Sequence, residues 1–184
     1  MSLLLNEVSM EIFYLFITSL IFLKIAYVDY KEHYIYDLDI VFAVAVILVY
    51  NLYLSNLKDA CIGGVIGFVI GYAIYAASYY VYKEEAFGFG DVLLLGVLGL
   101  FFGFPTFLHY FAVTIMATGV VAAVLILFDR KYRKMEVPMA PIFILGAVSY
   151  VLLGYPSIED TIIAAYYSFF VGIYGIFEMV LNMA

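Results

Sequence analysis

Two aspartates in this chain have the type and the setting for acid–base chemistry. Asp29 follows one long apolar stretch, and Asp91 opens another directly after two glycines in the run Gly88-Phe89-Gly90. An ionised carboxylate facing hydrocarbon costs about 3 kcal/mol or more, and two carboxylates that lie close together share one proton. The ionised member of such a pair can take a proton from water while the neutral member donates to a substrate. Peptide hydrolysis then needs no metal, cofactor or covalent intermediate.

The composition indicates that helices in a membrane must position these residues. Of the 184 residues, 67% are hydrophobic and 12% are charged, and the mean hydropathy is +1.11, far from the average of soluble proteins. We therefore expect one integral-membrane domain over residues 1–184, with membrane lipids around it. The net charge of -7 argues against a nucleic-acid partner. The single cysteine, Cys61, is interpreted as a small packing residue and excludes an intrachain disulfide framework.

The apolar stretches predict an all-α fold, a polytopic bundle of about six to seven transmembrane helices. A span needs roughly 20 apolar residues to cross a hydrocarbon core about 30 Å thick, and the sequence has no long alternating strand pattern. Charges and prolines delimit seven candidate spans: 10–28, 38–55, 60–82, 91–104, 106–128, 138–154 and 161–182. The first is expected to be retained, because Glu7 and Glu11 stand where a signal peptide has basic residues.

Basic residues orient the predicted bundle, because they accumulate on the cytoplasmic side of a membrane. The segment DRKYRK, residues 129–134, carries four of the eight Lys and Arg residues and is expected inside. This places the N-terminus outside and brings Asp29 and Asp91 to the cytoplasmic face of the cell membrane. Only 13 residues separate Asp91 from Pro105, or roughly 20 Å of helix, so the pair is expected to lie recessed below that face.

The candidate site residues also have purely structural interpretations. Asp91 could cap a helix by accepting backbone N–H bonds, and Asp29 could pair with Lys24 or Lys31. Gly88 and Gly90 have no Cβ, so they could let a peptide approach and expose N–H groups to an oxyanion, or they could serve packing alone.

Other glycines and the histidines are interpreted as structural residues. Gly63, Gly67 and Gly71 recur at every fourth position of the third span, a spacing that predicts close helix packing. His33 and His109 are interpreted as interfacial side chains, and no spacing of His, Asp and Glu predicts a metal site.

Three motifs resemble those of the GxGD aspartyl proteases, most closely the type IV prepilin peptidases, which include the archaeal preflagellin peptidases. The first is GFGD, residues 88–91, at the head of a span, and the second is Asp29 followed eight residues later by Asp37. The third is PMAP, residues 138–141, at the start of a late span. The resemblance covers about residues 10–155. It implies two catalytic residues and four residues in support: Asp29 and Asp91, with Gly88, Gly90, Pro138 and Pro141.

For function, the resemblance implies an aspartic endopeptidase that cleaves the class III signal peptide of type IV prepilin- or archaellin-like precursors at the cytoplasmic membrane face. Such precursors carry a basic leader, a glycine at the cleavage site and a hydrophobic helix. The resemblance implies no cofactor. N-methylation of the new N-terminus is not expected, because the chain lacks the Cys-rich loop of bifunctional bacterial members.

Acidic residues at the cytoplasmic helix ends predict where the basic leader binds. Glu84 and Glu85, just before the motif glycines, are expected to attract its basic residues. Asp37 and Asp39 are expected to cap the second span and orient the first loop. The alternative is that these acids only solvate the loops.

Three other functions remain open at this level. A protease similar to presenilin or signal peptide peptidase could use the same GxGD motif, although residues 138–141 do not match the Pro-Ala-Leu signature of that branch. A small proton or cation transporter could use Asp29 and Asp91 as a relay, but the sequence shows neither an inverted repeat nor matched broken helices. A noncatalytic assembly subunit would use both aspartates as caps and would tolerate their conservative replacement.

Overall fold

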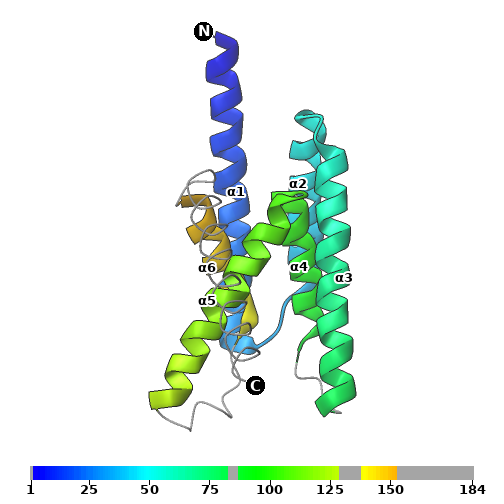
Figure 1. Ribbon diagram of the computed structural model, residues 1–184. Helices are drawn as coiled ribbons and strands as arrows, with labels where there is room; N and C mark the ends of the chain where they lie inside the picture. The colour runs from blue at the N-terminus through cyan, green and yellow to red at the C-terminus, as the bar shows by residue number, and fades with distance from the viewer. Residues whose placement is uncertain (1, 83–86, 129–137, 153–184) are drawn as a thin grey trace, which may run out of the picture. The chain divides into compact units, whose positions relative to one another are not determined.

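The structure is a computed structural model that describes residues 2–82, 87–128 and 138–152 (Figure 1). The chain divides into two compact units, residues 1–147 and 148–184. The first unit holds both candidate aspartates. Of the second unit, the described residues are 148–152, which continue the last helix. A single domain over residues 1–184 stays a prediction.

The described residues form six helices and contain no strand, which confirms the all-α prediction. The helices are α1 (Ser2–Glu32), α2 (Asp37–Tyr53), α3 (Leu57–Tyr82), α4 (Phe89–Phe102), α5 (Thr106–Phe128) and α6 (Met139–Leu152). They coincide with six of the seven predicted spans, and the seventh, 161–182, lies outside the described residues. The helix α1 continues four residues past the predicted end of the first span, from residue 28 to Glu32, so Asp29 lies inside the last turn of a helix.

The lengths and surfaces of these helices are those of a membrane bundle. Two stretches of the described chain, Ser9–Glu32 and Leu57–Val81, are long and apolar enough to cross a membrane, and α4 and α6 are shorter apolar helices. Large apolar side chains point outward, with Leu38 81% and Val49 70% exposed. Water would disfavour so much exposed apolar surface, whereas hydrocarbon tails accommodate it.

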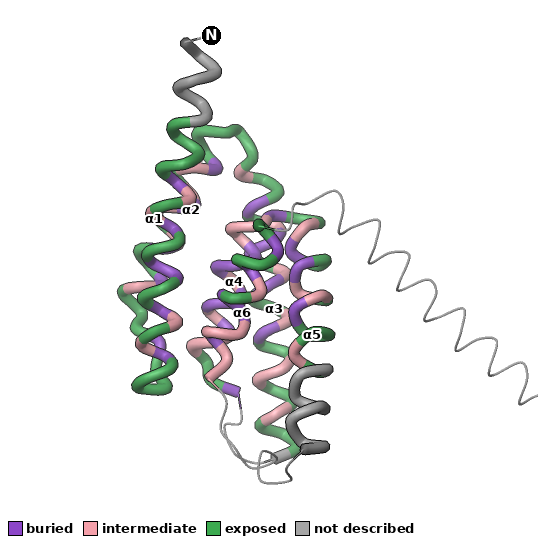
Figure 2. The backbone as a smooth tube through the Cα atoms, turned by 90° about the vertical axis from the view of Figure 1, so that its left-hand side faces the viewer, coloured by how far each residue is buried: buried purple, intermediate pink, exposed green. Residues whose placement is uncertain are grey.

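The short helix α4 is the most enclosed element of the first unit. It packs against α2, α3 and α5, and nearly all of its residues are buried or half-buried (Figure 2). Its only exposed residue is Phe89. Its Val and Leu side chains point in all directions, and a helix that is hydrophobic all round suits a buried position. Its C-terminal end is set by Gly103, whose φ of 68° and ψ of 175° are accessible to glycine alone.

Glycines bring α3 and α4 into backbone contact, as the spacing of Gly63, Gly67 and Gly71 predicts. A Cβ added to Gly63 would overlap the Gly99 carbonyl oxygen, and one added to Gly99 would overlap the Gly63 carbonyl oxygen. A Cβ on Gly67 would likewise overlap the Leu95 oxygen. Lipid tails provide no hydrophobic force between helices, so close packing of this kind is what holds them together.

The two packed helices differ in length. Gly71 of α3 lies level with Val92 of α4, since a Cβ on Gly71 would come within 3.0 Å of the Val92 Cα atom. From Gly71, α3 continues for 82 − 71 = 11 residues to Tyr82, which is about 16 Å of helix. By contrast, α4 begins only three residues before Val92, at Phe89.

The turn between α1 and α2 is fixed by local bonds. His33 adopts a left-handed conformation with φ 52° and its backbone N–H donates to the Asp29 carbonyl oxygen at 2.9 Å, which ends α1. Lys24 donates to Asp39 Oδ1 at 2.5 Å and so ties α1 to the first turn of α2. Within the turn, the Tyr36 hydroxyl donates to the Glu32 carboxylate, and this bond raises the pKa of Tyr36.

Candidate active site

Asp29 is buried at the end of α1, where only 7% of the residue's surface is exposed. Its Oδ2 atom accepts a hydrogen bond at 3.0 Å from the backbone N–H of Ala140, a residue 111 positions away. The ammonium group of Lys24 contacts Asp39 instead of Asp29, and Lys31, the other predicted partner, is exposed and forms no ion pair with Asp29 among the described residues. Asp29 is therefore held by the start of α6.

Asp91 occupies the third position of α4, where Gly88 is the N-cap. Its carboxyl accepts a backbone hydrogen bond from Gly88, as an acidic residue at this helix position can. The capping interpretation is thus correct for one side of the group. The Oδ1 atom, however, is buried and has no hydrogen-bond partner among the described residues.

The fold brings the two aspartates into electrostatic contact. The charge of Asp29 acts on the Asp91 carboxyl, a half-buried group whose Oδ1 atom is withdrawn from water. The helices α1 and α4 that carry them are separated in sequence by α2 and α3, and α2 contacts both α1 and α4. Two carboxylates so placed inside an apolar bundle have the arrangement that a shared proton requires.

The PMAP segment, residues 138–141, lies at this pair. Pro138 directly precedes α6, while Ala140 is fully buried and contacts Asp29 through its backbone. The helix is held in place from α5, because the buried Tyr110 hydroxyl donates to the Phe143 carbonyl oxygen at 2.7 Å. The sequence motif points to the two prolines but not to the Ala140 N–H between them, and the flanking prolines are its only signal in the sequence.

The motif glycines have unequal surroundings. A Cβ on Gly90 would come within 3.0 Å of the Ile35 Cβ atom, so Gly90 makes room for Ile35, the buried residue of the turn between α1 and α2. A Cβ on Gly88 would lie 3.3 Å from Asp91 Oδ2. The structure thus gives packing reasons for both positions. An oxyanion role for their N–H groups stays a prediction.

The remaining site predictions fall at the edge of the described structure or outside it. Asp37 is the exposed first residue of α2, and Tyr36 rather than an aspartate is its N-cap. The predicted capping of α2 by Asp37 or Asp39 is therefore wrong in the strict sense, although both lie in the favourable first turn. Glu84 and Glu85 lie outside the described residues. No group of three potential metal ligands occurs in the part of the chain that is described.

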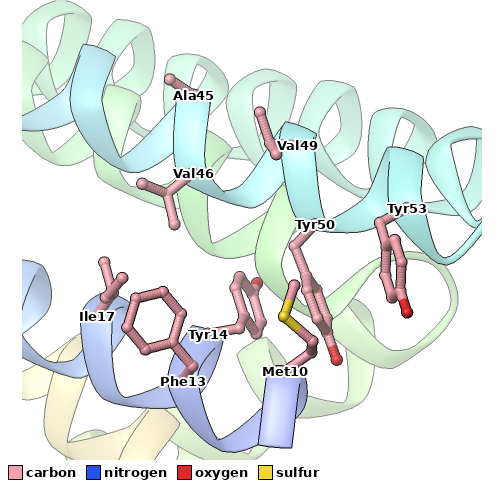
Figure 3. A pocket seen from close by; sticks show the side chains of 9 residues that line it. All are labelled: Met10, Phe13, Tyr14, Ile17, Ala45, Val46, Val49, Tyr50 and Tyr53. Atoms are coloured by element: carbon pink, nitrogen blue, oxygen red, sulfur yellow. The ribbon is translucent and has the colours of Figure 1, made fainter. Parts of the chain in front are cut away.

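A separate apolar groove of about 420 Å³ lies between α1 and α2 (Figure 3). Its walls come from the first half of α1 and the second half of α2, with Tyr14 stacked on Tyr50 at a centroid distance of 3.7 Å. Tyr14 and Asp29 are 29 − 14 = 15 residues apart on α1, or about 22 Å along the helix. The groove is therefore not part of the aspartate site.

Together, the fold and the site define a helical membrane protein with two carboxyl groups at the ends of two of its helices, of which Asp29 is buried and Asp91 half-buried. Residues 14–127 match the sequence model of the type IV leader peptidase family. The chain belongs to that family, as the three sequence motifs predict. The matched range includes Asp29 and Asp91 and ends before the PMAP segment.

One curated relative extends this comparison. Over 98 residues the chain is 32% identical to the type 4 prepilin-like proteins leader peptide-processing enzyme of Escherichia coli O78:H11 (strain H10407 / ETEC). The alignment covers 53% of this chain and 35% of the relative, so the chain spans only about a third of that protein's length. No solved structure matches the chain.

Proposed function

We propose that the chain is a membrane-embedded aspartic endopeptidase that removes the leader peptide from type IV prepilin- or archaellin-like precursors. The observation that supports this most is that Asp29 and Asp91 lie close enough to interact electrostatically. Asp29 accepts a backbone hydrogen bond, and Asp91 has a buried Oδ1 atom without a partner among the described residues. Family membership supports the substrate class. The proposed peptidase domain is the whole chain, residues 1–184, and the reaction uses water without a metal or cofactor.

The proposed orientation places the pair on the cytoplasmic side of the cell membrane, with the N-terminus outside. The bias of basic residues towards the segment 129–134 supports this. On that side the acids Asp37, Glu84 and Glu85 are proposed to attract the basic leader of the precursor, while its hydrophobic helix stays among the spans. We propose that the new N-terminus produced by cleavage is not methylated by this chain.

A direct test is to incubate the purified full-length chain in liposomes with a panel of precursors that bear a basic leader and a hydrophobic helix. We expect a gel shift for at least one precursor and a new N-terminus immediately after the leader by N-terminal sequencing. Cleavage inside the hydrophobic helix would instead indicate a protease of the presenilin type. Intact precursors together with an Asp91-dependent proton flux in the same liposomes would indicate a transporter.

The proposed orientation predicts opposite labelling of two positions. Cys61, contrary to its interpretation as a packing residue, is exposed near the start of α3, and Phe89 is exposed at the start of α4. Because α3 crosses the bundle between them, a membrane-impermeant maleimide should label native Cys61 only from outside. In a Phe89→Cys variant that also carries Cys61→Ser, labelling should occur only from the cytoplasmic side in inverted vesicles. The reverse pattern would show that the bundle is inverted.

A further inference from the structure

The geometry points to unequal roles for the two aspartates: Asp29 carries the negative charge and activates water, Asp91 carries the shared proton, and the Ala140 backbone N–H maintains this difference. The inference rests on the proposed peptidase function and specifies the division of labour within it. Asp29 and Asp91 are the catalytic residues, and Ala140 is a positioning residue that acts through Asp29.

The evidence for a charged Asp29 is its bond to α6. Pro138 and Pro141 have no N–H group, so only Met139 and Ala140 can donate from the segment 138–141. The Ala140 N–H donates to Asp29 Oδ2 at 3.0 Å in a fully buried setting. A hydrogen bond to an ionised acceptor is roughly twice as strong as one between neutral groups, and the positive end of the α6 dipole adds to it.

The evidence for a protonated Asp91 is its unpartnered oxygen. The Gly88 bond and the start of α4 favour charge on one side of the group, but Oδ1 is buried with no partner among the described residues. Burying an ionised oxygen without a hydrogen-bond partner costs free energy. Protonation removes the charge next to Asp29 and turns the group into a donor for a substrate carbonyl.

Few other charged side chains in the described residues could interact with the carboxyl groups of Asp29 and Asp91. Asp91 is the only ionisable side chain of α4, and α6 has no charged side chain. The Lys24 ammonium is committed to Asp39, and the His33 ring contacts the backbone oxygen of Asp29 rather than its carboxylate. The other charged residues of α1 and α2 near the turn are exposed: Lys31, Glu32 and Asp37.

With this assignment the reaction balances. The water oxygen bonds to the scissile carbonyl carbon while a water proton passes to Asp29 and the Asp91 proton passes to the carbonyl oxygen. The carbon–nitrogen bond then breaks as Asp29 gives its proton to the leaving amine. A hydroxyl of the diol intermediate returns a proton to Asp91, so both groups regain their starting states.

A first test compares the thermal midpoints of Asp91→Asn and Asp29→Asn in detergent at pH 7, and it needs no substrate. An amide resembles a protonated carboxyl, so Asp91→Asn should melt at or above the wild-type temperature. Asp29→Asn replaces a charged acceptor of the Ala140 N–H by a neutral one and should melt a few degrees lower. The reverse order, or equal losses, would overturn the assignment, even if no precursor were ever cleaved.

A second test removes only the Ala140 N–H, by incorporating lactic acid at position 140 so that an ester replaces the amide. The acidic limb of the cleavage profile reports protonation of the base and should move to higher pH by about one unit, whereas the basic limb should stay. The matched control is an ester at Met139, which should leave both limbs in place. An unmoved acidic limb in a folded variant, or a moved basic limb, would contradict the role of Ala140. A wild-type chain that cleaves no precursor would refute the proposed function instead.

Discussion

Asp91→Asn and Asp29→Asn are each expected to abolish leader removal, lowering the cleavage rate by at least about 10³-fold while the protein stays folded in the membrane. Positioned proton transfer contributes roughly 10²–10⁴-fold to such reactions, and an amide can neither share the proton nor accept one from water. The burial of Asp29 and the isolated Oδ1 atom of Asp91 leave no described carboxyl in place to substitute. The measurement is a gel-shift assay with a precursor that the wild type processes.

Two aspartates outside the pair serve as matched controls for this experiment. Asp59→Asn, at the exposed start of α3, should cleave at the wild-type rate. Asp37→Asn, at the exposed start of α2, should show at most a mild defect. Normal processing by Asp29→Asn or Asp91→Asn would contradict the aspartic mechanism and favour an assembly role for the chain.

Gly99→Ala is expected to destabilise the protein by about 1–3 kcal/mol or more, the range for overpacked cores. The added methyl group would overlap the Gly63 carbonyl oxygen, which is backbone and cannot move aside as a side chain could. Because α4 carries Asp91, we expect a lower thermal midpoint in detergent and reduced cleavage together.

The control for this effect is a glycine with empty space around it. A Cβ on Gly119 of α5 would meet nothing within 4 Å, so Gly119→Ala should stabilise the helix by up to about 1 kcal/mol. If both variants melted at the wild-type temperature, α3 and α4 would not be in close backbone contact.

The helices and the aspartate pair could be predicted from the sequence because both leave local signals. Apolar runs interrupted by charges delimit the six described helices, and the spacing of Gly63, Gly67 and Gly71 marks a packing face that the structure confirms. Asp29 follows one apolar run and Asp91 opens another, and these positions mark both as candidates. Their meeting requires only that an even number of helices, here α2 and α3, lies between them in the chain.

Contacts made by backbone atoms between distant segments could not be predicted in this way. The bond from Ala140 to Asp29 joins residues 111 positions apart, and an alanine gives no chemical signal of its own. The position of Gly90 against Ile35 is similar, because a missing Cβ does not show which neighbour needs the space. The exposure of Cys61 depends on which face of α3 the glycines turn inward, and its residue type alone suggested the opposite.

The unequal lengths of α3 and α4 determine how many residues a substrate needs to reach Asp91 from the end of α3. A scissile bond at Asp91 lies about 16 Å short of the level where α3 ends at Tyr82. An extended peptide covers roughly 3.3 Å per residue, so about five residues are needed to pass from that level down to the carboxyl pair. A folded helix would need twice as many residues for the same distance, and its closed backbone would keep the peptide bond from water. If the chain cleaves precursors as proposed, a precursor that enters along α3 is therefore expected to be unwound over about five residues, and a shorter leader would hold its basic residues inside the bundle.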